Sequence, residues 1–130
     1  MGIFSDNKAS TMYSKCAFHW RLVQKQYEEF AKSDGISSDD SHRALEISKY
    51  CKSLEGLLNS ANKGLKPKPD LEAFSQGMTQ VAQIYGELDS FPEKRHRLLE
   101  LLEFTPRVLS GNYGSLWRNA EGYNHYWFSD

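Results

Sequence analysis

The sequence predicts a single all-α domain over residues 1–130, an antiparallel bundle of four main helices with a short, aromatic-rich C-terminal extension. Three observations carry this prediction. Apolar residues recur every three or four positions along most of the chain, Gly and Pro interrupt that pattern, and 130 residues are an ordinary length for one domain. Because the interruptions are short, neighbouring helices are expected to pack antiparallel.

The first helix is expected over about residues 7–32. Its apolar residues follow alternating steps of four and three: Cys16, Trp20, Val23, Tyr27 and Phe30. Residues at this spacing share one face of an α-helix. Asp34-Gly35 supplies the end of the helix, because glycine tolerates the left-handed conformation of a C-terminal cap.

The second helix is expected over about residues 39–62. Ser37, Asp39 and Asp40 suit its start, because hydroxyl groups cap free N–H groups and acids complement the positive end of the helix dipole. Its apolar stripe again follows steps of three and four: Ala44, Ile47, Cys51, Leu54, Leu58 and Ala61. Gly64 is expected to close it.

A linker with two prolines, residues 65–70, separates the second helix from a third at about 71–88. Pro67 and Pro69 remove two N–H donors and favour extended backbone before each ring. Asp70 can then cap the third helix. Its stripe consists of Leu71, Phe74, Met78, Val81, Tyr85 and Leu88.

The fourth helix is expected over about residues 91–104. Ser90 and Glu93 match a capping box, in which a serine cap is followed three residues later by glutamate. Its apolar residues form a wide face that favours a central position in the bundle: Leu98, Leu99, Leu101, Leu102 and Phe104. Pro106 is expected to kink or end this helix, or to begin a short helical turn through Leu109.

The composition limits the classes of function. The chain has 16 basic and 17 acidic residues and a net charge of −1, so no overall field attracts nucleic acid or an anionic membrane. No apolar run approaches the roughly 18 residues that a membrane span needs. The N-terminus lacks the pattern of a signal peptide, and Asp6 stands where a myristoylation motif has Ser or Thr. We therefore expect a cytoplasmic protein, in its own cell or in a host cell.

Cys16, His19 and Cys51 are the candidate metal ligands. A structural zinc site uses four ligands, whereas only three can be named here. Both cysteines lie on apolar stripes, where a free thiol packs as a small hydrophobic group. We therefore interpret them as reduced core residues and expect no metal; a disulfide is the alternative in an oxidising compartment.

No residue stands out as catalytic. The acidic pairs Asp39-Asp40 and Glu28-Glu29, and Glu100 with Glu103, lie where a solvated helix surface or helix start would place them. There is no glycine-rich phosphate loop and no Gly-x-Ser-x-Gly motif. We therefore predict a protein that is not an enzyme and that needs no cofactor.

Lys94, Arg95 and Arg97 form the one basic run, with His96 between them. Such a run can contact phosphate groups, nucleic acid or an acidic partner. The alternative is a solvated first turn of the fourth helix. Cations at that end oppose the helix dipole, which keeps the basic patch as a candidate.

The C-terminal segment concentrates aromatic residues, with a helical turn expected at 115–121. Six aromatic residues fall within residues 113–130: Tyr113, Trp117, Tyr123, Tyr126, Trp127 and Phe128. One alternative is that they fold back and close one end of the bundle. The other is a partner-binding surface, because Trp and Tyr dominate interface hot spots.

These observations favour a non-enzymatic protein–protein interaction module, such as an adaptor, inhibitor or immunity-type factor. It would act through a helical surface and the aromatic C-terminal segment. Self-association as a homodimer fits the same prediction. The alternatives are a membrane-surface module similar in helical texture to BAR domains, and a nucleic-acid-binding protein that uses residues 94–97, which the near-neutral charge disfavours.

Overall fold

The computed structural model describes the backbone of residues 2–112 and the side chains of residues 9–112. The backbone forms four helices and, over these residues, no strand: α1 (Gly2–Ala31), α2 (Ser38–Ala61), α3 (Leu71–Glu87) and α4 (Arg95–Ser110). The predicted all-α bundle is confirmed. The helical turn expected at 115–121 lies outside the described residues.

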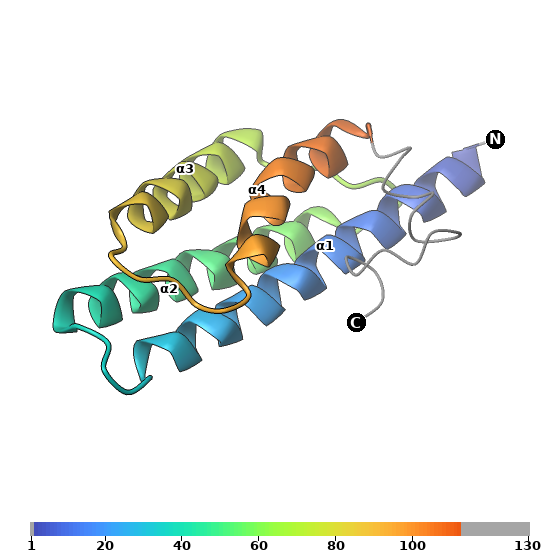
Figure 1. Ribbon diagram of the computed structural model, residues 1–130. Coiled ribbons are helices and arrows are strands. Elements are labelled where there is room, and N and C mark those ends of the chain that lie inside the picture. The colour runs from blue at the N-terminus through green and yellow to red at the C-terminus, as the bar shows by residue number, and fades with distance from the viewer. Residues whose placement is uncertain (1, 113–130) are drawn as a thin grey trace.

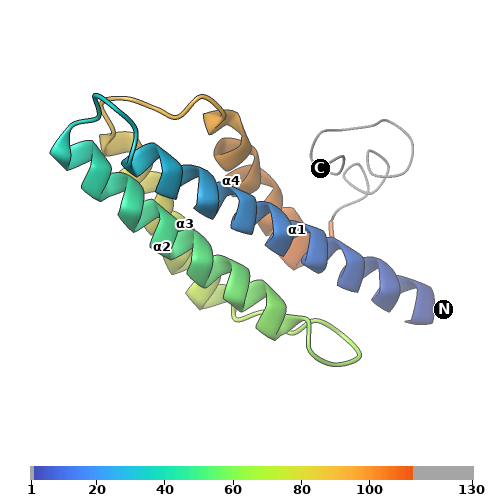
Figure 2. The same ribbon diagram turned by 90° about the horizontal axis from the view of Figure 1, so that it is seen from below.

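The helices form two layers. α1 and α2 run side by side as a long antiparallel pair, and α3 and α4 lie over them (Figure 1). The view turned by 90° shows α1 and α2 in front, with α3 and α4 behind (Figure 2). α3 packs mainly on α2 and α4 mainly on α1, whereas α3 and α4 meet each other at only a few positions.

The core lies between the two layers and follows the predicted stripes of α1 and α2. Trp20, Val23 and Tyr27 of α1 are completely buried. Every member of the predicted α2 stripe is buried as well. Burial of this apolar surface provides the main stabilisation of the bundle, at roughly 25 cal/mol for each Å² removed from water.

The starts of α2 and α3 are capped as predicted. The Ser37 hydroxyl accepts a hydrogen bond of 3.0 Å from the backbone N–H of Asp40. Asp70 accepts one of 3.1 Å from the backbone N–H of Ala73. α2 ends at Ala61, before Gly64, and α1 begins at Gly2, five residues before the predicted start, because its apolar stripe marks only the later turns.

The predicted start of α4 is wrong. Ser90 does not cap this helix, because its backbone N–H and its hydroxyl both donate to the carboxylate of Asp40. α4 begins at Arg95 instead, and the residue before it, Lys94, makes no side-chain cap. A contact between distant parts of the chain has therefore overridden a local capping pattern.

The predicted end of α4 is wrong too. Pro106 lies inside the helix, which continues to Ser110 and ends where Gly111 adopts a left-handed conformation with φ of 78°. The expected central position is only partly realised. Leu98 and Leu101 are buried, but Leu99 is 45% exposed because α4 packs on α1 along one side only.

Gly77 of α3 packs closely against a side chain of α2. A Cβ atom at this position would lie 2.9 Å from Cδ2 of Leu54, which is completely buried on α2. No atom lies within 4 Å of the corresponding position on Gly56, an exposed glycine inside α2. The two glycines therefore differ in packing while both lie in helices.

Gly77→Ala is expected to destabilise the protein by about 1 kcal/mol, because crowding Leu54 outweighs the gain in helix propensity. Gly56→Ala, the matched control, is expected to stabilise it by about 0.5–1 kcal/mol. Urea unfolding followed by circular dichroism measures both. Equal stabilisation by the two substitutions would show that α2 and α3 are not held together as closely as described.

Candidate functional site

The predicted cysteine and histidine candidates lie in the core. Cys16 is fully buried, and its Sγ lies 3.4 Å from Oγ1 of Thr105 on α4. The same Oγ1 accepts a hydrogen bond of 2.9 Å from Nε1–H of Trp20. This small polar cluster joins α1 to α4 inside the core.

Burial controls the chemistry of both thiols, which are free. Desolvation raises the pKa of Cys16 to about 12, against the lowering effect of hydrogen bonds with Thr105 and Trp20. Desolvation also raises the pKa of Cys51. Both thiols are therefore protonated near neutral pH, whereas nucleophilic chemistry requires the thiolate. Among the described residues, no group of three or more His, Cys, Asp or Glu side chains is placed to hold a metal ion.

His19 contacts α4. It is 2% exposed, and its Nδ1 lies 3.1 Å from a guanidinium nitrogen of Arg97. Arginine can only donate, so Nδ1 acts as the acceptor in this contact. His19 and Arg97 thus form a second polar link between α1 and α4.

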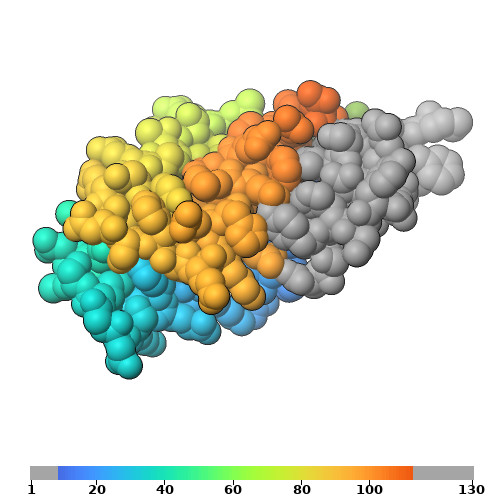
Figure 3. All heavy atoms as spheres, viewed as in Figure 1, coloured from blue at the N-terminus to red at the C-terminus, as the bar shows by residue number. Residues whose placement is uncertain are grey.

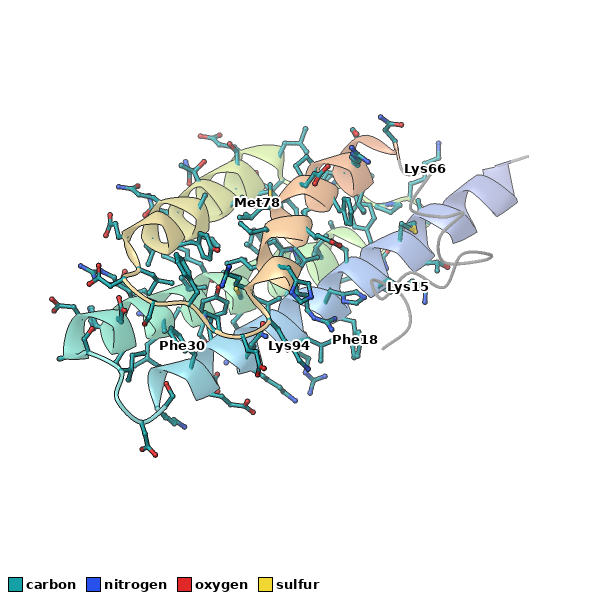
Figure 4. The ribbon with its side chains drawn as sticks, in the orientation of Figure 1. Lys15, Phe18, Phe30, Lys66, Met78 and Lys94 are labelled. Atoms are coloured by element: carbon teal, nitrogen blue, oxygen red, sulfur yellow. The ribbon has the colours of Figure 1, made fainter. Side chains whose placement is uncertain are left out.

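Two of the three cations in the predicted basic patch, Lys94 and Arg97, line one cleft, whereas Arg95 is not among its lining residues. The Arg95 guanidinium lies over the ring of Phe91, 5.3 Å from its centroid, whereas Arg97 contacts His19 on α1. Lys94 lies at the start of α4, toward the side of the molecule that carries Phe18 (Figure 4). Lys94 lines a cleft that also contains the carboxylates of Glu29 and Glu93. The residues that line this cleft are Phe18, Leu22, Lys25, Gln26, Glu29, Phe30, Ser33, Pro92, Glu93, Lys94 and Arg97.

The aromatic candidates lie outside the described residues. This applies to Tyr113, Trp117, Tyr123, Tyr126, Trp127 and Phe128. Their part in binding a partner therefore stays a prediction.

The acidic pair Asp39-Asp40 lies in the first turn of α2, one of the two positions expected for it, and only Asp39 is exposed. Asp40 is 2% exposed and holds the segment between α3 and α4. Its carboxylate accepts hydrogen bonds from the backbone N–H of Asp89 at 3.1 Å and of Ser90 at 3.0 Å, and from the Ser90 hydroxyl at 2.9 Å. Arg43 adds an ion pair at 3.3 Å. Desolvation alone would raise the pKa of Asp40, but these hydrogen bonds together lower it below the ordinary 3.8.

A surface groove with a volume of about 510 Å³ lies between α3 and α4. These two helices lie side by side on the face shown in Figure 3, and Met78 lies on α3 toward α4 (Figure 4). The groove is lined by Leu71, Phe74, Ser75, Met78, Thr79, Ala82, Leu102, Pro106, Leu109 and Ser110. We name this surface the α3–α4 groove.

The groove exists because α4 carries two apolar stripes. One stripe faces the core and is buried: Leu98, Leu101, Thr105 and Val108. The adjacent stripe follows the same spacing one position later, and its last three members line the groove: Leu99, Leu102, Pro106 and Leu109. α3 is arranged similarly, with Phe74, Val81 and Ile84 buried and a second row facing α4: Leu71, Ser75, Met78 and Ala82.

The α3–α4 groove is apolar and uncharged. None of the described side chains that line it carries a charge, and its only polar side chains are the hydroxyls of Ser75, Thr79 and Ser110. Leu71 is 60% exposed at one end. The groove therefore presents uncharged, mostly apolar side chains at its open side.

The sequence contains a signal for this groove, but the same signal also fits a core. The wide apolar face of the fourth helix predicts burial by several neighbours, and the apolar stripe of the third helix predicts that Leu71 and Met78 are buried. The structure leaves Leu71 exposed and Met78 only partly buried. Two adjacent stripes on one helix can indicate either a central helix or an unfilled groove, and periodicity alone does not separate the two.

Comparison with protein-family models, with curated proteins and with solved structures finds no match to this chain. Across the described residues, no helix combines the length and the apolar character required to cross a membrane.

Proposed function

We propose that this protein is a non-enzymatic protein-interaction module whose α3–α4 groove binds an amphipathic helix of another protein. The observation that supports the proposal is the uncharged apolar groove between two helices that scarcely touch each other. Laying the apolar face of one helix into such a groove is a recurrent mode of peptide recognition.

The shape and spacing of the groove favour a helix as its occupant. The α3 wall from Leu71 to Ala82 extends over about 16 Å, or three helical turns, at 1.5 Å for each residue. The lining residues recur at steps of three and four on both walls, which matches the spacing of side chains along one face of a docked helix. A third helix would complete the packing that α3 and α4 leave unfinished.

The exposure of the walls argues against a small-molecule site. Small-ligand pockets bury most of the ligand surface. Here Leu71, Thr79, Ala82 and Pro106 are all exposed, so the groove is open along its length. An extended occupant covers these side chains better than a compact ligand does.

Met78→Glu is expected to weaken partner binding at least about tenfold, because a carboxylate in the centre of the groove would be buried without a counter-charge. Ala82→Glu tests the same wall at an exposed position that the fold tolerates. The matched control is Leu45→Glu, which alters an exposed leucine on α2. Capture of binding proteins from native lysate, with folding checked by circular dichroism, compares the three variants.

The proposal fails if Met78→Glu and Ala82→Glu capture the same proteins as the unaltered chain, or if Leu45→Glu loses them equally. The aromatic residues of segment 113–130 are proposed as a second part of the contact, and the double variant Trp117→Ala/Trp127→Ala tests them in the same assay. Loss of capture in both sets of variants would assign binding to both surfaces.

A further inference from the structure

The loop between α2 and α3, residues 62–70, exposes an apolar side chain among three lysines. Leu65 is 92% exposed, more than any other large apolar side chain that the structure describes. The exposed side chains of Lys63, Lys66 and Lys68 flank it in the sequence on both sides. Figure 2 shows the loop extending outward from the end of α2. Leu65 therefore adds little to the core, and the tip of the loop is open to a partner surface.

Several contacts and two prolines constrain the shape of this loop. The backbone N–H of Lys68 donates to the carbonyl of Ala61, at the end of α2, with a distance of 2.8 Å. The side-chain amide of Asn62 donates to a backbone carbonyl of α1 at 3.2 Å, which ties the start of the loop to the bundle. Pro67 and Pro69 restrict the backbone of its second half. A partner that binds the tip of the loop therefore has to order little of the backbone.

The loop is positively charged although the whole chain is nearly neutral. No acidic residue occurs from residue 63 to residue 69. Within the part of the chain that the structure describes, none of the three lysines forms an ion pair with a carboxylate. Asp70, the next acid along the chain, uses its carboxylate to cap α3 through the N–H of Ala73. The charges of the three lysines are therefore available to an anionic partner.

We propose that the loop segment 63–68 docks this protein on the surface of an anionic membrane. The three lysines lie among the negatively charged lipid headgroups, which attract basic side chains that come within a Debye length of the surface. Leu65 enters the boundary between the headgroups and the acyl chains, where its apolar side chain leaves water. A nucleic acid pairs with the same cations, but its phosphate backbone offers no comparable place for an aliphatic side chain. An exposed leucine between lysines thus favours a lipid surface.

A contact of this size gives weak and reversible membrane binding, as a single lipid chain does. The net charge of −1 adds no long-range attraction, so the binding depends on headgroups close to the loop and weakens as salt is added. None of residues 63–68 lines the α3–α4 groove. Membrane binding and helix binding therefore use different side chains and can fail independently.

The test is co-sedimentation of the full chain with vesicles of phosphatidylcholine that contain about 30% phosphatidylserine, and with vesicles of phosphatidylcholine alone. Lys66→Gln/Lys68→Gln removes two charges from the loop, and Leu65→Gln removes its apolar side chain. The same proteins are also titrated with duplex DNA, which offers phosphate groups without a lipid phase.

Matched controls come from α2. Lys49→Gln/Lys52→Gln makes the same change in net charge at two exposed lysines, and Leu45→Gln replaces an exposed leucine. Circular dichroism checks that every variant is folded.

The unaltered protein is expected to sediment with the anionic vesicles and not with phosphatidylcholine alone. The loop variant with two lysines replaced should bind the anionic vesicles at least about tenfold more weakly, and Leu65→Gln about five- to tenfold more weakly. The α2 controls should bind as the unaltered protein does.

Four results would overturn the proposal: no binding to the anionic vesicles, equal binding to phosphatidylcholine alone, unchanged binding by Leu65→Gln, or an equal loss in the α2 controls. DNA binding that depends on the loop lysines but not on Leu65, without vesicle binding, would assign the loop to nucleic acid instead.

Discussion

Replacing Trp20 by alanine is expected to lower the free energy of unfolding by about 3–5 kcal/mol, a large part of the total stability of a domain this size. The indole is completely buried between the layers, and its Nε1–H donates to Thr105 on α4. The substitution therefore removes packing from the centre of the core and breaks a hydrogen bond between two helices. Urea unfolding followed by circular dichroism measures the loss.

Two further variants separate the contribution of packing from that of the hydrogen bond between Trp20 and Thr105. Thr105→Val keeps the shape of the side chain but leaves the Trp20 N–H without an acceptor, which is expected to cost about 1–3 kcal/mol. Phe18→Ala removes a ring from α1 that is 42% exposed, and it should cost less than Trp20→Ala. A loss for Trp20→Ala no greater than for Phe18→Ala would contradict the described core.

Asp40→Ala is expected to destabilise the protein by about 3 kcal/mol, because the backbone N–H groups of Asp89 and Ser90 lose a charged acceptor. Removal of the Asp40 carboxylate should also make the segment between α3 and α4 more mobile. Asp39→Ala is the matched control, since it removes an exposed carboxylate from the same helical turn. Asp39→Ala is expected to lower the free energy of unfolding by only about 0.3–1 kcal/mol, which is the contribution of this carboxylate's interaction with the helix dipole.

The contribution of Asp40 is expected to depend on pH. The pKa of Asp40 is lowered in the folded state, so the folded protein binds this proton less readily than the unfolded chain does. The stabilisation is therefore fully present above the unfolded pKa of 3.8 and is lost as the pH falls through the lower folded value. Unfolding measured from neutral to acidic pH should show the difference between the unaltered protein and Asp40→Ala shrinking in acid. A difference that grows in acid would contradict this sign.

The sequence predicted elements well where local signals agreed. The boundaries of α2 were predicted within one residue, because the Ser37 cap, the acidic first turn and the apolar stripe all indicate the same helix. α4 was placed wrongly because Ser90 bonds to Asp40, 50 residues away in the chain, and no local pattern reveals that partner.

The candidate site was harder to predict because it depends on how two helices diverge. Apolar spacing identifies the faces of α3 and α4, but it does not give the distance between them. The surroundings of the basic run were hidden for a similar reason. Arg95 and Arg97 are two residues apart, about half a helical turn, and their spacing does not reveal that Arg95 contacts Phe91 and Arg97 contacts His19.

The central claim is that the α3–α4 groove receives a helix from another protein, and site-specific photo-crosslinking tests it most directly. A photoreactive amino acid is placed at Thr79, on the exposed wall of the groove, and as a control at Lys52, an exposed residue of α2. The account predicts an adduct at Thr79 that maps to an amphipathic helical segment of another protein and disappears in Met78→Glu. Equal adducts at Lys52, an adduct that survives Met78→Glu, or crosslinking only to a second copy of this chain would contradict it.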